Sequence, residues 1–181
     1  MKDCMLDLET LGVGTNAVVI SIGAVMFDLD THDRVGETFY TNVNVQSCLD
    51  AGLTVNGGTL GFWLKQPDEA RLALLSDPIP FLKVACQKFA EYCTRNWAKT
   101  LWGNGATFDN IIIRNAFYAV GEQFPVHYRG DRDVRTIVDL AKRLGVGQER
   151  TTRVGVHHNA LDDAMYQVGY VTDLYRKIKQ R

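Results

Sequence analysis

The chain has 181 residues, of which 46% are hydrophobic and 23% are charged, and its formal net charge is −1. This length and composition predict a single globular domain over residues 1–181, whose core needs no disulfide or structural metal. The near-zero net charge excludes polyanion binding by the surface as a whole. The four cysteines show no finger or C-x-x-C spacing and no long apolar run occurs, so we expect a cytoplasmic protein with reduced thiols and no membrane partner.

Residues 5–10 near the N-terminus predict a short apolar strand that ends in two acids, Asp7 and Glu9. Residues i and i+2 of a strand share one face, so these carboxylates are expected side by side, opposite Leu6 and Leu8. Two neighbouring carboxylates repel each other, and a hard cation such as Mg²⁺ or Mn²⁺ removes that repulsion. A D-x-E pair is common on its own, so a solvated strand end is the competing interpretation.

Residues 12–17 read G-x-G-x-x-A, which is formally a dinucleotide-binding pattern. That pattern needs a helix next, whereas residues 17–27 are rich in β-branched side chains and predict a second strand. A nucleotide-cofactor enzyme is therefore a minor alternative, which a strand over residues 17–27 would remove. A third strand is expected over about residues 35–45, after a turn at residues 28–34, so that the three strands form an antiparallel meander.

Residues 46–58 contain three glycines and are expected to be a loop. Thr59 is the predicted N-cap of a short helix, and Pro67 either ends this helix or begins the next one. Phe62 and Trp63 are adjacent and cannot share one helix face. In one interpretation both side chains pack internally, and in the other one of them lines a cleft where nucleic-acid bases stack.

Residues 78–97 carry apolar side chains at three- and four-residue spacing, which predicts an amphipathic core helix. A short strand is expected over residues 99–102, and a helix from about residue 107 to residue 120 follows a tight turn. Asp109 falls in the first turn of that helix. The helix dipole alone favours an acid at this position.

The C-terminal third begins with a basic loop, after which residues 133–136 are expected to form a short strand and residues 137–144 a helix. Gly145 ends that helix. With the three N-terminal strands and the strand over residues 99–102, this gives five expected strands.

The last helix is expected to begin at an N-cap residue, Asn159, and to run to about Lys179. His158 then lies on the loop just before the helix, and Asp163 lies in its first turn. An imidazole and a carboxylate therefore share one helix end. Each residue alone also has an ordinary explanation, because a surface histidine is common and an acid is favoured near a helix N-terminus.

Three segments together resemble the motifs of the DEDD 3′–5′ exonucleases, namely Asp7–Thr10, Asn104–Asp109 and His158–Ala164. The third segment has the H-x-A-x-x-D-A form of the His branch of that family, DEDDh. The segments around Phe62 and over residues 133–136 are further similar to the subgroup of phage exonuclease A and the actinobacterial exoribonucleases.

The resemblance implies an α/β protein with a ribonuclease H-like fold, in which helices flank a mixed five-stranded sheet that contains an antiparallel three-strand meander. It implies that two divalent metal ions, Mg²⁺ or Mn²⁺, are held by Asp7, Glu9, Asp109 and Asp163. It also implies His158 as the general base. His157 and Asp162 lie one position off the motif and are expected only to support the structure. The expected substrate-binding residues are Thr10, Leu11, Phe62, Trp63 and Arg135.

The implied activity is that of a hydrolase, a metal-dependent 3′–5′ exonuclease that releases nucleoside 5′-monophosphates from the 3′ end of single-stranded DNA or RNA. The alternative is a catalytically silent module that binds 3′ ends, and the complete set of acids with a histidine argues against it. No sequence motif indicates a contact with the 2′-hydroxyl, which only RNA carries, so both DNA and RNA stay open as partners. The expected location is the cytoplasm of a bacterial cell or a phage-infected host. Relatives of this fold often work as dimers, and a homodimer stays open as well.

Overall fold

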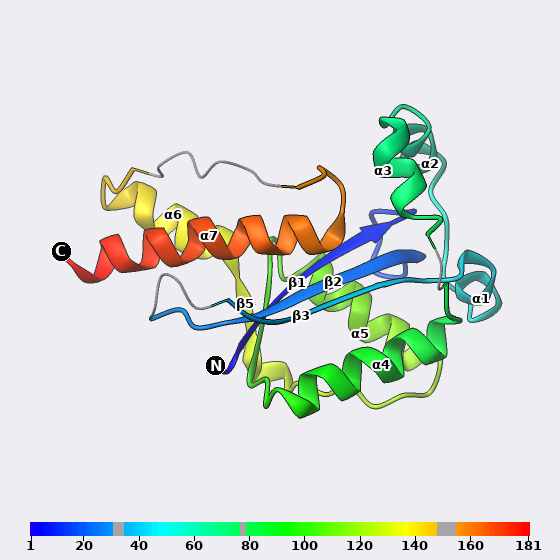
Figure 1. The fold of residues 1–181 in the computed structure, drawn as a ribbon, viewed down its shortest axis with the longest axis horizontal. Coiled ribbons are helices and arrows are strands. Elements are labelled where there is room, and N and C mark those ends of the chain that lie inside the picture. The colour runs from blue at the N-terminus through cyan, green and yellow to red at the C-terminus, as the bar shows by residue number, and fades with distance from the viewer. Residues whose placement is uncertain (31–34, 77–78, 148–154) are drawn as a thin grey trace.

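A central five-stranded sheet organises the computed structural model, which describes residues 1–30, 35–76, 79–147 and 155–181. The strand order is β3-β2-β1-β4-β5 (Figure 1). β1 (Asp3–Thr10), β2 (Val19–Phe27) and β3 (Val35–Asn42) form an antiparallel meander, whereas β4 (Thr100–Gly103) and β5 (Asp131–Asp133) run parallel to β1. The predicted α/β architecture with a mixed five-stranded sheet is therefore confirmed.

Helices cover both faces of this sheet (Figure 1). α4 (Leu82–Arg95) and α5 (Asp109–Ala119) pack on one face, and α6 (Val134–Arg143) and α7 (Ala160–Lys179) pack on the other. Alternate β1 side chains enter the two cores, since those of positions 4, 6 and 8 meet α4 and α5 while that of position 5 meets α6 and α7. By the same alternation, positions 7 and 9 point to the α7 face.

Three short helices connect β3 to α4 at the right of Figure 1, namely α1 (Val45–Asp50), α2 (Gly57–Trp63) and α3 (Asp68–Ala73). The prediction of a loop over residues 46–58 was wrong at both ends. Asn44 starts α1, because its side chain accepts a hydrogen bond from the Ser47 N–H at 2.9 Å. The third strand accordingly ends earlier than expected, before Asn44.

Short polar side chains also shifted other predicted boundaries. Asn56, and not Thr59, caps α2, because its Oδ1 accepts hydrogen bonds from two backbone N–H groups of the first turn. Asp133 caps α6 by accepting from the Arg135 N–H at 2.8 Å, so the last strand and this helix both begin earlier than predicted. Pro67 begins α3. The predicted core helix over residues 78–97 is α4, which begins at Leu82 and ends at Arg95. Position 78 itself lies outside the described residues.

The predicted residues at two other helix ends were confirmed. Asn159 caps α7, and Gly145 follows α6 with a φ of +65°. Residues 19–27 form a strand, which removes the nucleotide-cofactor alternative. All four cysteines are buried and free. Within the described ranges, every helix is too short or too polar to span a lipid bilayer.

Candidate active site

Three carboxylates converge where β1 passes beneath the N-terminus of α7. Asp7 and Glu9 extend from β1, and Asp163 extends from the first turn of α7. One carboxylate oxygen from each residue lies within 4.8 Å of the other two. Glu9 is 8% exposed, so its charge is largely removed from water. Carboxylates at this spacing repel one another. Their oxygen atoms are the ligands that a hard divalent cation such as Mg²⁺ prefers, so a bound cation would remove this repulsion.

Gly23 on β2 allows α7 to come this close to the sheet. Gly23 is the cross-strand partner of Asp7, and a Cβ at this position would overlap with the backbone of Ala160 and Leu161. The first turn of α7 therefore rests directly on β2, beside Asp7. Gly23 was not among the predicted site residues, although a glycine inside a strand of β-branched residues is a sign of close backbone approach.

Gln167 orients the Asp7 carboxylate. Its Nε2 donates a hydrogen bond to Asp7 Oδ1 at 2.7 Å, and the Gln167 side chain is buried. Gln167 follows Asp163 by four residues, so both side chains lie on the α7 face that meets β1. Gln167 was not among the predicted site residues, and its four-residue spacing from Asp163 was the signal that could have identified it.

Asp109, the first residue of α5, reaches the same end of β1. Its Oδ1 accepts a hydrogen bond from the Leu8 N–H at 3.2 Å. Burial raises the pKa of the Asp109 carboxyl to about 7, while the Leu8 hydrogen bond and the positive charge of Arg135 oppose this rise. Among the described residues, Asp109 does not share the 4.8 Å group that the other three acids form.

Arg135 lies against the loop that leads to Asp109. A Cβ on Gly105, where φ is +113°, would come within 3.1 Å of the Arg135 guanidinium carbon. The Asp133 carboxylate also holds this loop, because its Oδ2 accepts from the Ala106 N–H at 2.8 Å. The exposed Arg135 side chain thus places a positive charge over the start of α5.

His158 lies beside the acid cluster. One of its ring nitrogens is within 4.8 Å of an Asp163 carboxylate oxygen. Its ring makes edge contacts with Phe62 and Trp63, with ring centroids 5.1 Å and 5.9 Å away. Residue 62 belongs to α2, so the histidine loop and this helix form one continuous wall.

Asp162 shapes the loop that carries the histidine. Its Oδ2 accepts a hydrogen bond from the Val156 N–H at 2.8 Å. Gly155 has a φ of +95° and lies so close to the Asp162 carboxylate that any Cβ there would overlap with it. The Asp162 carboxylate therefore fixes the turn before α7.

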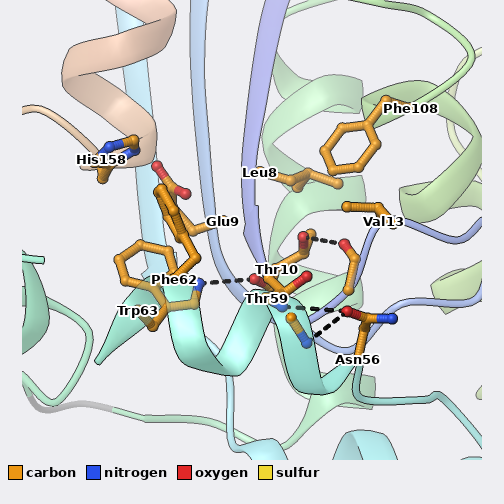
Figure 2. A pocket seen from close by; sticks show the side chains of 12 residues that line it. Leu8, Glu9, Thr10, Val13, Asn56, Thr59, Phe62, Trp63, Phe108 and His158 are labelled. Carbon is orange, nitrogen blue, oxygen red and sulfur yellow. Dashed lines mark hydrogen bonds between the residues drawn. The ribbon is translucent and has the colours of Figure 1, made fainter. Parts of the chain in front are cut away.

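A pocket of about 490 Å³ opens in front of Glu9. Figure 2 shows Glu9 and His158 at one end, the α2 residues along the base, and Leu8 and Phe108 on the opposite side. The residues that line it are Leu8, Glu9, Thr10, Gly12, Val13, Asn56, Gly58, Thr59, Phe62, Trp63, Phe108 and His158.

The two adjacent aromatic residues of α2 have different environments. Trp63 is 6% exposed, and its Nε1 donates a hydrogen bond to the Thr10 carbonyl at 2.9 Å. Phe62 is 42% exposed and presents its ring to the pocket (Figure 2). Thr10 Oγ1 donates to the Gly12 carbonyl, so the end of β1 is held on both sides. Leu11 is partly buried and lines a separate pocket of about 210 Å³.

Comparison with solved structures supports the ribonuclease H-like fold. The structure is similar to E. coli exonuclease I in complex with a dT13 oligonucleotide, with a TM-score of 0.63 and 18% identity over 99% of this chain and 41% of that chain. A product-bound exonuclease I gives a TM-score of 0.59 and 16% identity over 99% and 43% of the two chains. Exonuclease X in complex with 5′-overhanging duplex DNA gives 0.59 and 13% over 97% and 92%. This chain thus spans about two fifths of the exonuclease I length.

No curated protein sequence matches the chain. A family model does match it, over residues 2–175, and describes a 3′–5′ exoribonuclease Rv2179c-like domain. That match covers all the segments from which the resemblance to 3′–5′ exonucleases was drawn. The chain therefore belongs to the Rv2179c-like 3′–5′ exoribonuclease domain family.

Proposed function

We propose that this protein is a metal-dependent 3′–5′ exonuclease that hydrolyses the last phosphodiester bond of a single strand and releases nucleoside 5′-monophosphates. Membership of an exoribonuclease domain family supports nuclease activity. The observation that carries the proposal is the meeting of Asp7, Glu9 and Asp163 beside His158, at one end of a pocket of about 490 Å³.

The four acids would hold two divalent ions, Mg²⁺ or Mn²⁺. Bound ions would supply positive charge that stabilises the transition state and makes the attacking water more acidic. Asp7, Glu9 and Asp163 have the oxygen donors and the spacing for this role. Asp109 is a buried carboxyl with a raised pKa, and a nearby cation would favour its charged form.

His158 would accept the proton of the attacking water. An imidazole has an ordinary pKa close to neutrality, so it can take and return a proton at working pH. The Asp163 carboxylate lies within 4.8 Å of a His158 nitrogen, and a negative charge at this distance favours the imidazolium that proton transfer creates.

The pocket would hold the terminal nucleotide. The exposed Phe62 ring offers a stacking surface for a base, while Trp63 fixes the Thr10 backbone beside it. Arg135 would contact a phosphate, because a guanidinium binds phosphate oxygens in a fork. The family resemblance also suggests Leu11 next to the last base, although its side chain lines the neighbouring pocket.

RNA is the proposed first choice of substrate, because the family description names an exoribonuclease. The fold also accommodates DNA, since E. coli exonuclease I is similar in structure and is seen with a dT13 oligonucleotide. Substrate choice depends on contacts with the 2′-hydroxyl, which only RNA carries.

The test uses two 5′-labelled single strands of one sequence, one RNA and one DNA, with Mg²⁺ or Mn²⁺. We expect a ladder that shortens from the 3′ end and is faster for RNA. EDTA, His158→Ala and Asp163→Asn should each abolish the ladder. A folded wild-type protein that binds 3′ ends but shortens neither strand under either metal would instead be a silent binding module.

A further inference from the structure

A second group of metal-binding side chains shares Asp163 with the acid cluster. His157, His158 and Asp163 each offer one donor atom, and these three atoms lie within 4.8 Å of one another. The two imidazole rings are in contact, with their centroids 3.9 Å apart. This group differs in chemistry from the acid cluster, because two of its three donors are nitrogen atoms.

The backbone before α7 holds the two histidines together. His158 has a φ of +66°, in the left-handed region that residues with a side chain rarely adopt. Asp162 fixes the preceding turn through the Val156 N–H, and Asn159 caps the helix that follows. Because both flanks are fixed, this turn brings adjacent histidine side chains to one point, at the cost of backbone strain.

The donor set suits Zn²⁺ better than Mg²⁺. Zinc is bound by imidazole nitrogen and carboxylate oxygen in tetrahedral sites with bonds of about 2.0–2.2 Å, which places neighbouring donors about 3.3 Å apart. Closing the present group to that spacing takes a small movement of exposed or partly exposed side chains. Mg²⁺ instead prefers six oxygen ligands in an octahedron. Three protein ligands leave the fourth zinc position open to water.

An ion can reach this group from solvent. His157 is exposed, and both histidines line a pocket of about 560 Å³ on the side facing α3. Glu69 lines the same pocket and adds negative charge near the entrance. An entry path and a carboxylate close to the donors both favour capture of a dication.

We propose that His157, His158 and Asp163 bind a single Zn²⁺ ion, and that this ion inhibits the enzyme. A His158 nitrogen whose lone pair binds zinc cannot accept a proton from water. The same ion would compete for the Asp163 carboxylate with the ions of the acid cluster. The inhibitory effect rests on the proposed function, whereas zinc binding itself does not.

Binding is tested by titrating Zn²⁺ into the metal-free full chain against a chromogenic zinc indicator. His157→Ala removes one of three protein ligands, and we expect it to weaken zinc affinity by roughly a hundredfold, at least the loss seen for outer-shell changes. Glu9→Gln is the matched control, because it breaks the acid cluster and keeps all three zinc donors. We expect wild-type zinc affinity in Glu9→Gln.

Activity gives a second measurement, in which each protein's Mg²⁺-dependent rate with Zn²⁺ is divided by its own rate without Zn²⁺. Wild type should be inhibited at micromolar Zn²⁺, and His157→Ala should resist by the factor found in the binding titration. Circular dichroism confirms that the variant is folded, and His157→Gln repeats the test with a bulkier side chain.

Two results would overturn the zinc site. The first is equal zinc affinity in wild type and His157→Ala, and the second is loss of zinc binding in Glu9→Gln, which would place the ion in the acid cluster. If the protein degrades no nucleic acid at all, the zinc titration still shows whether the zinc site exists. Failure of the zinc proposal is therefore distinguishable from failure of the nuclease proposal.

Discussion

Replacing Gly23 with alanine tests whether the contact between β2 and α7 builds the active site. A Cβ at position 23 would overlap with the backbone of Ala160 and Leu161, which form the first turn of α7. Backbone atoms cannot rotate away as a side chain does, so the helix end must move off the sheet. Asp163 and His158 would move with it, while Asp7 would stay on β1.

The size of the effect follows from this geometry. Reaching ordinary van der Waals separation requires a shift of the helix end by at least about 1 Å. Overpacking of this kind costs about 1–3 kcal/mol of folding free energy. A misplacement of about 1 Å at a catalytic site lowers the rate by about 10²-fold. We therefore expect Gly23→Ala to fold with reduced stability and to lose about two orders of magnitude in exonuclease rate.

The assay combines urea unfolding with the rate of 3′-end shortening by the folded protein. Gly14→Ala is the control, because a Cβ at position 14 meets nothing within 4 Å. The control should keep both stability and rate. If Gly23→Ala matched the control in both measurements, the close approach of α7 to β2 would not be what positions the proposed catalytic residues.

Three further predictions follow from single contacts. Gln167→Leu removes the hydrogen bond to Asp7, so we expect the Mg²⁺ concentration that gives half-maximal rate to rise by about 10–100-fold; an unchanged Mg²⁺ titration would argue against this orienting role. Asp109→Asn removes a buried carboxyl whose pKa is raised from 3.8 to about 7, a shift that penalises folding fully above about pH 7 and not below about pH 4. The free energy of unfolding of the metal-free variant, measured in urea, should therefore exceed that of wild type by about 2–4 kcal/mol above pH 7 and should equal it near pH 4. A difference that does not depend on pH would contradict this. Phe62→Ala removes the exposed pocket ring, so KM for a single strand should rise by about 5–150-fold, from a stacking loss of about 1–3 kcal/mol, with kcat little changed; a loss confined to kcat would refute stacking at this residue.

Local sequence signals were enough to predict the three-strand meander and the two acids on β1. The two-residue spacing of Asp7 and Glu9 sets both side chains on one face of a strand, whatever packs above them. Asn159 caps its helix through its own neighbours, so the position of the last helix was also predictable. Such features depend on contacts a few residues apart in the chain.

Helix boundaries and side-chain contacts that depend on distant parts of the chain were harder to predict from the sequence. Asn56, and not Thr59, caps α2 because the Asn56 N–H donates a hydrogen bond to the Leu11 carbonyl and so fixes the place where the helix begins. Trp63 is buried because its indole meets the end of β1, 53 positions earlier in the chain, while its neighbour Phe62 stays exposed. Adjacency alone showed that the two rings must diverge, and only the tertiary structure assigned the directions.

The sequence by itself thus predicted the candidate residues for the chemistry and most of the short elements that hold them. The tertiary structure decided how those residues meet. Gly23 brings α7 against β2, and Gln167 reaches Asp7 across 160 positions of sequence. It also brings Asp109 of α5 to the backbone of β1 at Leu8, where burial raises its pKa. These relations come from the packing of distant segments, which no local pattern of residues records.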